Sequence, residues 1–333
     1  MTEIGGYYSI ASHFEDCVLD DNFPSFDFNS GRNALLFALI MLKPVQVYFP
    51  YFTCSSIHNI LSDIHFDLYH LDSNYLPIID KLPSNSVLII NNYFGNMLPR
   101  IKEWLKKNSI PNNQVIIDNT HSLNFSAVNE QKFYQFFSPR KFLGVPDGGI
   151  LHTPKLNFDW IDEYKKLPVD SSLERIKWVF NPLENMRNSN YQEFLKYRET
   201  LQDMPVSQMS KTTKFLLRTL DYKRYLKRRS NVHRLSIEFV NSTGFWRQHS
   251  LYSTHLSIGI PVVCARPLEI QKQLAKSGVY VVNYWPGFFG DKLLNHHELD
   301  LLRTIILPID IYKLTENPNY HEIIKFISLA EKC

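Results

Sequence analysis

The stretch FFSPRKFLGVPDGGIL, residues 136–151, decides how the rest of the chain is interpreted. One lysine, Lys141, stands among apolar residues, and a turn with Gly144, Pro146 and the pair Gly148–Gly149 follows it before an apolar strand. In most proteins such a lysine is a solvated surface cation. The alternative is an amine that forms a Schiff base with an aldehyde, which requires a pKa lowered by burial or by neighbouring positive charge.

The composition is that of an ordinary soluble globular protein. The chain has 333 residues, more than a single hydrophobic core usually holds, which predicts two domains. A net charge of +3 favours neither nucleic acid nor a membrane as a partner. The N-terminus lacks the pattern of a signal peptide, and no apolar run of about 18 residues predicts a transmembrane helix. The four cysteines (Cys17, Cys54, Cys264 and Cys333) form no C-x-x-C pair, so we expect a reducing cytoplasm and no zinc site.

The first half of the chain alternates short apolar runs with helical stretches. Strands are predicted at 45–50, 66–71, 86–95 and 113–122, and helices at 30–43, 55–64 and 100–108. This alternation is typical of βαβ units and predicts an α/β fold with a mostly parallel sheet. Ligands of such sheets bind beyond the carboxyl ends of the strands.

The second half has a different pattern. From about residue 155 to 240 it is helical and polar, and it includes a long basic amphipathic helix at 222–242. Short strands and a final helix follow, which predicts a smaller α+β domain. We place the boundary near residue 225, giving a large domain of residues 1–225 and a small domain of residues 226–333.

Two further motifs accompany the lysine turn. Ser30 and Gly31 precede a helix whose first N–H groups are free to bind a phosphate, although such a pair is usually only a helix cap. Asp118 ends an apolar strand, where a carboxylate is costly unless it meets a cation. It is either a helix cap or the partner of a protonated ring nitrogen. His121 follows three residues later and either caps the chain or binds the same ligand.

Together the motifs describe a phosphate cradle, a partner for a pyridinium nitrogen and an aldehyde-capturing lysine, in that order along one α/β domain. Pyridoxal 5'-phosphate requires this combination of groups.

At this point the sequence resembles the DegT/StrS-type nucleotide-sugar aminotransferases, and in particular a divergent bacterial branch with the run SPRKFLGVPDGG. The resemblance covers most of the chain and includes the segments SGRNALLFAL, VYFPYFTCSSI, NNYFG, IIDNTHS and SPRKFLGVPDGGIL. It implies the pyridoxal phosphate-dependent transferase fold type I, similar to aspartate aminotransferase. That fold has a large domain with a mainly parallel seven-stranded sheet flanked by helices, and a smaller α+β C-terminal domain.

The resemblance also assigns roles to individual residues. Lys141 would bind the cofactor as a Schiff base, Asp118 would pair with the pyridine nitrogen, and His121 would contact the ring hydroxyl. Cys54 stands where the family often has an aromatic residue over the ring. The remaining cofactor-binding residues would hold the phosphate: Ser30, Gly31, Arg32, Asn33 and Ser138.

The implied activity is an aminotransferase that moves an amino group from an amino acid donor to a keto sugar. The sugar would be nucleotide-linked and used for surface polysaccharide. The family further implies a homodimer with shared active sites, to which the run Asn185 to Arg187 would contribute across the interface. Neither nucleic acid nor membrane insertion is expected.

Other interpretations stay open at this stage. The altered phosphate turn and Cys54 are compatible with a catalytically degenerate or non-enzymatic fold-type-I protein with a binding or regulatory role. The basic run 223–234 could bind DNA. Cys54 could act as a nucleophile with His58 or His121, although a buried inert cysteine is the more common case. The pair His296–His297 is interpreted as loop histidines rather than a metal site.

Overall fold

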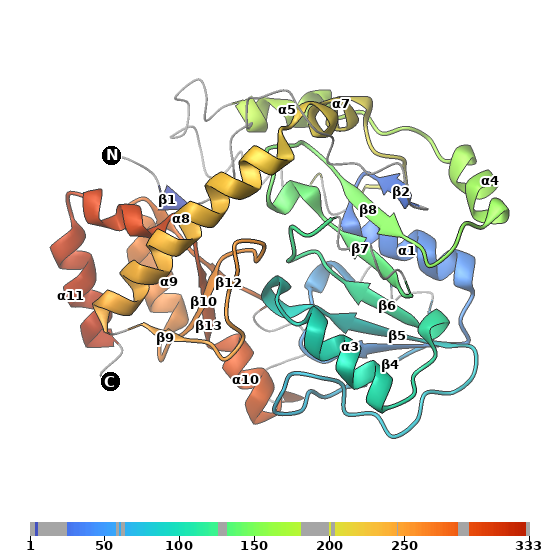
Figure 1. Ribbon diagram of the computed structural model, residues 1–333, viewed down its shortest axis with the longest axis horizontal. Helices are drawn as coiled ribbons and strands as arrows, with labels where there is room; N and C mark the ends of the chain where they lie inside the picture. Colours follow the sequence, from blue (N-terminus) through green and yellow to red (C-terminus); the bar gives the residue numbers. More distant parts are fainter. Residues whose placement is uncertain are drawn as a thin grey trace.

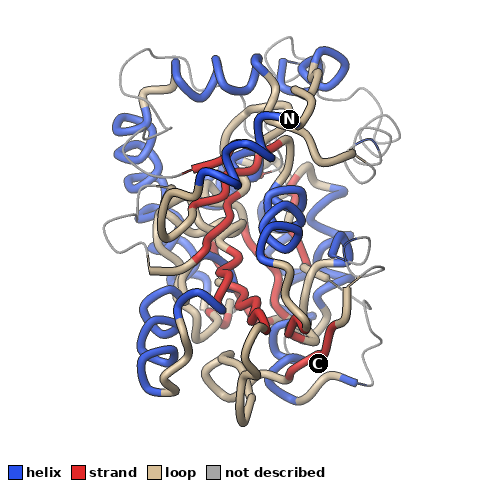
Figure 2. Tube along the Cα trace, turned by 90° about the vertical axis from the view of Figure 1, so that its right-hand side faces the viewer, coloured by secondary structure: helices blue, strands red, loops and turns tan. Residues whose placement is uncertain are grey.

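The structure is a computed structural model that describes residues 4–5, 25–57, 60, 64–125, 132–180, 200, 204–244, 246–285 and 293–330. A large sheet with its helices occupies one side of the molecule and a smaller sheet with its own helices the other (Figure 1). In the perpendicular view, the strands run through the middle of the molecule with helices on both sides (Figure 2). Of the helices in this described part, none has the length and apolar content needed to cross a membrane.

The large sheet has seven strands in the order β2-β8-β7-β6-β5-β3-β4. All neighbouring pairs from β4 to β7 are parallel, whereas β8 is antiparallel to both β7 and β2. The predicted α/β fold with a mainly parallel seven-stranded sheet is therefore confirmed. The strands span Ser25–Phe28 (β2), Gln46–Pro50 (β3), Phe66–Tyr69 (β4), Ser86–Asn91 (β5), Val115–Asp118 (β6), Tyr134–Phe137 (β7) and Gly149–His152 (β8).

Helices cover this sheet and bury its central strands. Every residue of β5, β6 and β8 is buried, as expected for strands with a packed layer on each face. Of the predicted helix 55–64, Ser55–Ile57 form a 3-10 turn (η1), and most of the rest lies outside the described residues. The helices are Gly31–Leu42 (α1), Leu98–Lys107 (α3), Phe158–Lys166 (α4), Leu173–Phe180 (α5) and Lys211–Thr219 (α7), with 3-10 turns at Tyr93–Gly95 (η2), Asn112–Gln114 (η3) and Pro139–Lys141 (η4).

The smaller part is an antiparallel sheet in the order β12-β13-β10-β9, packed against helices. This is the α+β arrangement that the sequence predicts for the C-terminal region. A separate parallel pair joins β1 near the N-terminus to β11. The elements are Ile4–Gly5 (β1), Arg247–Gln248 (β9), Ile260–Val263 (β10), Pro267–Lys276 (α9), Val279–Tyr280 (β11), Val282–Asn283 (β12), His296–Leu302 (α10), Thr304–Leu307 (β13), Ile311–Glu316 (η6) and Tyr320–Ala330 (α11).

One long helix, Tyr222–Thr243 (α8), joins the two parts (Figure 1). Its first residue, Tyr222, packs into the apolar cluster beside the lysine turn, and Phe239 and Val240 pack into the core of the small sheet. The boundary expected near residue 225 falls inside this continuous helix, and its position stays a prediction.

A buried carboxylate holds the two parts together at another point. Glu298 of α10 is fully buried, and its carboxylate accepts hydrogen bonds from the backbone N–H of Leu71 at 3.0 Å and of Asn295 at 2.8 Å. His70 Nδ1 lies 3.0 Å from the same carboxylate. Because His70 and Leu71 directly follow β4, these bonds fix the small part against the edge of the large sheet.

The start of α1 lies in close contact with β8. A Cβ atom added at Gly149 would lie 2.1 Å from the carbonyl oxygen of Ser30, far inside van der Waals contact. The backbone N–H of Gly148 donates to Asn29 O at 2.9 Å, and Ser30 and Gly148 form an isolated bridge. The Gly148–Gly149 pair is therefore required for β8 to approach the N-terminus of α1.

Replacing Gly149 by alanine should force these two segments apart. We expect Gly149→Ala to lower the free energy of unfolding by about 3 kcal/mol or more, because the clash is with backbone atoms that cannot rotate away. The matched control is Gly244→Ala at the end of α8. There φ is +69° but nothing lies within 4 Å of an added Cβ, so a loss of about 1 kcal/mol is expected from backbone strain alone. Urea unfolding of the three proteins measures the difference, and equal losses would contradict the close-contact explanation.

Candidate active site

The Lys141 amine points into the protein. Lys141 ends the turn η4 that directly follows β7, and its Nζ donates to the hydroxyl of Thr120 at 3.0 Å. Burial lowers the pKa of the Lys141 amine below its ordinary value, and the charge of Arg140 acts in the same direction. The Asp118 carboxylate and the Cys54 thiol act in the opposite direction and raise this pKa. The amine therefore has the property that Schiff-base chemistry requires, a larger neutral fraction than an exposed lysine.

Asp118 lies beside this lysine. It is the last residue of β6, it is 8% exposed, and its Oδ1 accepts a hydrogen bond from the backbone N–H of Thr120 at 2.8 Å. Burial raises the pKa of the Asp118 carboxyl, whereas Lys141 and the bonds to Thr120 lower it. Thr120 thus binds Asp118 through its backbone and Lys141 through its hydroxyl, and the two predicted catalytic residues lie on either side of it.

His121 lies in the same segment and is 3% exposed. Its ring stacks on that of Trp285, with centroids 5.3 Å apart and planes 18° apart, and it contacts Tyr284 at 4.4 Å. Burial, with a smaller effect of Lys141, keeps the pKa of His121 well below its ordinary value, so the imidazole is neutral. Its Nε2 has no hydrogen-bond partner within the described residues. A buried polar atom of this kind calls for an explanation, such as a bound water or ion or a catalytic role.

The N-terminus of α1 reaches the same place. A Cβ atom added at Gly31 would lie 3.1 Å from Thr120 Cγ2 and 3.4 Å from the carbonyl oxygen of Phe137. The helix therefore begins in contact with the residue that binds Lys141. Ser30 caps it through a hydrogen bond from the backbone N–H of Asn33 to Ser30 Oγ at 3.1 Å. The positive end of the helix dipole lies beside the lysine turn and would favour an anion there.

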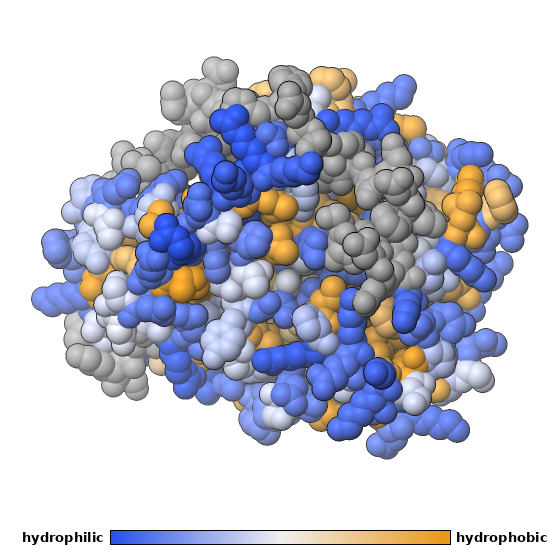
Figure 3. Space-filling view, viewed as in Figure 1, coloured by the Kyte–Doolittle hydropathy of each residue, from blue (hydrophilic) through white to orange (hydrophobic). Residues whose placement is uncertain are grey.

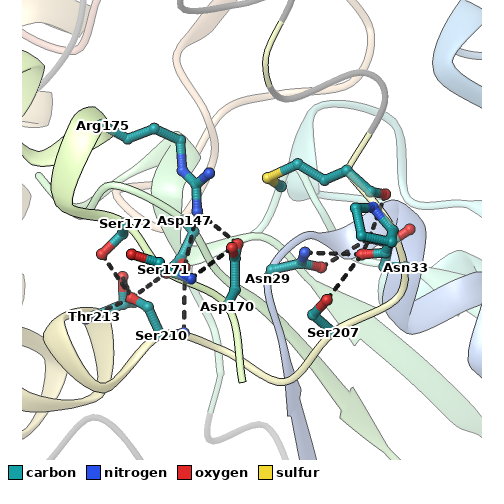
Figure 4. Close-up of polar contacts among 12 residues, drawn as sticks. Asn29, Asn33, Asp147, Asp170, Ser171, Ser172, Arg175, Ser207, Ser210 and Thr213 are labelled. Atoms are coloured by element: carbon teal, nitrogen blue, oxygen red, sulfur yellow. Dashed lines mark hydrogen bonds and ion pairs between the residues drawn. The ribbon is translucent and has the colours of Figure 1, made fainter. Parts of the chain in front are cut away.

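The side chain of Asn33 points away from the lysine. Its Nδ2 donates to Asn29 Oδ1 at 2.7 Å, to Pro205 O at 2.9 Å and to Met204 O at 3.1 Å (Figure 4). These bonds attach the segment around Pro205 to the first turn of α1. Arg32 is partly buried on the same turn. The phosphate-binding roles of both residues stay predictions. In Asn33 the side-chain amide makes these three bonds and the backbone N–H donates to Ser30 Oγ.

Cys54 and Ser138 flank the site on two further loops. Ser138 is buried at the end of β7, and its carbonyl accepts from the backbone N–H of Lys141 at 3.1 Å. Cys54 is partly buried, and its Sγ lies 3.1 Å from the hydroxyl of Ser56. A hydroxyl does not activate a thiol as an imidazole would. His58, the other residue of the nucleophile interpretation, lies outside the described residues, as does the run Asn185 to Arg187.

A buried polar network centred on Asp147 fixes the end of the loop that follows Lys141. Asp147, six residues after Lys141, is fully buried and accepts from the backbone N–H of Ser210 at 3.2 Å and from its hydroxyl at 3.1 Å. Arg175 Nη2 lies 3.6 Å from Asp147 and 2.5 Å from Asp170 (Figure 4). Because Asp147 directly precedes Gly148, this network fixes the turn that packs against Ser30.

Three residues that the sequence analysis did not assign belong to this site. Thr120 joins Asp118 to Lys141, and its place inside the DNTH motif was the available signal. Trp285 stacks on His121 with a left-handed φ of 54°, a contact between residues far apart in the sequence that no local pattern indicates. Asn91 is level with Asp118 in the pairing of β5 with β6, and its buried Oδ1 has no partner in the described part of the chain.

His296 and His297, interpreted from the sequence as loop histidines, are instead the first two residues of α10. Aromatic residues near Cys54 are also engaged within the protein. Tyr93 donates its hydroxyl to Phe52 O at 2.7 Å, and Tyr51 stacks on His70 at 4.2 Å. These aromatic side chains therefore already have partners inside the protein. The described residues contain no group of three or more potential metal ligands from histidine, cysteine, aspartate or glutamate.

Comparison with known proteins identifies solved structures with a similar fold. No protein-family model matches the chain, and a search of curated proteins also finds no match. Solved structures do match. NtdA from Bacillus subtilis, crystallised with its bound cofactor PMP, has a TM-score of 0.60 at 12% identity, over 90% of this chain and 73% of that one. The sugar aminotransferase CalS13 from Micromonospora echinospora has a TM-score of 0.56 at 12% identity, over 92% and 87%.

A third similar structure is a DegT DnrJ EryC1 StrS aminotransferase from Brucella abortus, with a TM-score of 0.54 at 14% identity, over 93% of this chain and 86% of that one. At these identities the likeness establishes the fold, and the predicted fold type I is confirmed. What the chain does has to be argued from its own site.

The charge of Asp118 should have a measurable effect on the pKa of the Lys141 amine. We expect Asp118→Asn to lower the pKa of the amine further, because the carboxylate is the largest influence that opposes burial. The pH midpoint for reductive methylation of Lys141, followed by peptide mass spectrometry, should then move to lower pH. Asp159→Asn, at an exposed position of α4, should leave it unchanged. An unchanged or higher midpoint in Asp118→Asn would show that the two side chains do not interact.

Proposed function

We propose that this chain is a pyridoxal phosphate-dependent aminotransferase. The observation that carries the proposal is the partly buried Lys141 amine, with its lowered pKa, held through Thr120 beside the Asp118 carboxylate at the carboxyl end of a parallel strand. Neither group has a structural reason to be buried there, because each is costly to remove from water and they do not form a direct ion pair within the described structure.

The residues present fit this cofactor. Asp118 offers a carboxylate to the protonated ring nitrogen, and His121 offers the unpartnered Nε2 to the ring hydroxyl. The first turn of α1, with Ser30 and Gly31, offers backbone N–H groups to the phosphate. When bound, pyridoxal phosphate supplies an electron sink that makes loss of the α-proton of an amino acid feasible.

Each residue would have a separate task in the reaction. Lys141 would first hold the cofactor aldehyde, and its freed Nζ would then accept the α-proton of the donor and return a proton at the acceptor carbon. Asp118 would keep the ring nitrogen protonated, so its own carboxyl must stay ionised against the effect of burial. The proximity of Lys141 and the bonds to Thr120 favour that ionised form. The neutral ring of His121, fixed by Trp285, would orient the cofactor without adding charge.

The proposed acceptor is a keto sugar, and the proposed donor is an amino acid such as glutamate. Similar folds occur in a protein described as a sugar aminotransferase, and the motif order resembles enzymes that act on nucleotide-linked sugars. We accordingly propose a nucleotide-linked keto sugar destined for surface polysaccharide. The proposal also includes a homodimer with shared active sites in the cytoplasm, as the family resemblance implies.

Cofactor binding tests the proposal directly. Purified protein mixed with pyridoxal phosphate should develop a visible absorption band, and borohydride should then fix one cofactor on the peptide that contains Lys141. Lys141→Ala should abolish both signals, whereas Lys155→Ala, at an exposed lysine, should abolish neither. Glutamate should discharge the band in the wild type by half-transamination.

The failures of this experiment are also informative. If the wild type binds no cofactor, or if the band survives in Lys141→Ala, the enzymatic proposal is wrong. If the protein binds the cofactor on Lys141 but no amino acid discharges the band, a catalytically degenerate binding protein of the same fold is the better description.

A further inference from the structure

We propose that Tyr225 and Arg229, on one face of helix α8, position the turn that carries Lys141 and link it to the small domain. The consequence for catalysis depends on the proposed function, but the positioning itself does not. Within the described residues, the hydrogen bonds of Tyr225 and Arg229 go to groups other than Lys141, so both would act through the backbone of neighbouring segments.

The first contact reaches the lysine turn itself. The Tyr225 hydroxyl donates to the carbonyl oxygen of Phe142 at 3.0 Å, one residue after Lys141. The ring of Phe142 is fully buried, and the guanidinium of Arg229 lies 5.6 Å from its centroid, within the range of a cation–π contact. Arg229 Nη1 in turn lies 3.4 Å from the Tyr225 hydroxyl. Phe142, which directly follows Lys141, is thus contacted by both Tyr225 and Arg229.

The second set of contacts reaches the loop that precedes β10. Arg229 is only 4% exposed, and it donates from Nε to His255 O and from Nη2 to Ser257 O, both at 2.7 Å. This fork of donors is specific to arginine, because a lysine ammonium cannot reach two carbonyls with the same planar geometry. Arg229 therefore ties the loop of residues 253–258 to the same helix face that holds Phe142.

The third set of contacts joins the loop of residues 253–258 and helix α8 to the segment that carries Asp118 and His121. Leu123 N donates to Leu256 O at 2.8 Å, and Ser122 and Ser257 form an isolated bridge. Tyr222, three residues before Tyr225, donates its hydroxyl to Leu123 O. Both segments that carry the candidate catalytic residues are thus attached to hydroxyls of the same helix, one residue after Lys141 and five residues after Asp118.

These contacts also change the interpretation of the basic run 223–234. Lys223, Arg224, Lys227 and Arg228 are exposed on α8, and strongly hydrophilic atoms lie over this half of the helix (Figure 3). Arg229 differs from them, because it is turned inward and used within the fold. Its sequence neighbour Arg228 is therefore a matched control with the same charge and the same helix.

The test measures Lys141 in the protein without cofactor. In Tyr225→Phe and Arg229→Met, a turn that is no longer held should let water reach the amine, and the pH midpoint for reductive methylation of Lys141 should move up toward that of an exposed lysine. Arg229→Lys, which keeps the positive charge, should show a smaller upward move of this midpoint than Arg229→Met. Arg228→Met and Tyr252→Phe, at a tyrosine that is 68% exposed, should match the wild type.

Thermal unfolding of each variant separates positioning from stability. A lower melting temperature with an unchanged midpoint in Tyr225→Phe would overturn the proposal, because the bonds would then be structural only. Should Arg229→Met fail to fold, Tyr225→Phe still decides, since it removes one oxygen atom and leaves the packing intact.

A cofactor measurement extends the test. If the wild type binds pyridoxal phosphate, Tyr225→Phe should weaken this binding roughly fivefold, about the value of one hydrogen bond. Equal affinities would overturn the link to the cofactor. If the wild type binds none while the methylation midpoint still shifts, the proposed function fails and the positioning role stands.

Discussion

The candidate site depends on keeping the partly buried amine of Lys141 and the buried carboxylate of Asp118 close together without joining them. Each group would be strongly unfavourable alone in a protein interior, and a direct ion pair would be the simplest remedy. Here Thr120 stands between them, and its backbone N–H and its hydroxyl each bind one of the two. The two groups still influence each other, because the carboxylate raises the pKa of the amine and the amine lowers the pKa of the carboxyl. The protein thus leaves the pair close but unjoined, which is the arrangement that the proposed cofactor would use.

The sheet makes this arrangement possible because parallel strands end at the same edge. Asp118 ends β6, and the lysine turn directly follows the neighbouring strand β7, so the two segments are adjacent by topology. The antiparallel strand β8 then returns beside β7, and its Gly148–Gly149 pair admits the N-terminus of α1. A side chain at Gly149 would prevent that approach. The glycine pair and the buried Asp147 network are thus as necessary for the site as the residues that face it.

The sequence predicted the parts of this structure that depend on local pattern. Apolar runs and helical periodicity located β3, β5, β6, α1 and α8, and the motif around Lys141 indicated the site. The contacts of Arg229 could not be predicted, because its partners are backbone carbonyls, which every residue has and which leave no trace in the sequence. The position of β2 was missed for a related reason. It pairs with β8, which is more than a hundred residues away. Phe26 and Phe28 do alternate with Ser25 and Asp27 as in a half-buried strand, but four residues are a short run for such a pattern to be recognised.

Cys54 and Trp285 together bear on how this site could hold a planar ligand. A cysteine at position 54 offers much less surface than an aromatic ring for packing against a planar ligand. Trp285 comes from the small domain, yet it packs against Phe52 at 5.4 Å, two residues before Cys54, and stacks on His121. Its left-handed backbone is unfavourable for a bulky residue, so the surrounding contacts must hold it there. An aromatic wall supplied by the small domain makes the site depend on how the two parts are joined. The buried bonds of Glu298 and Arg229 maintain that junction.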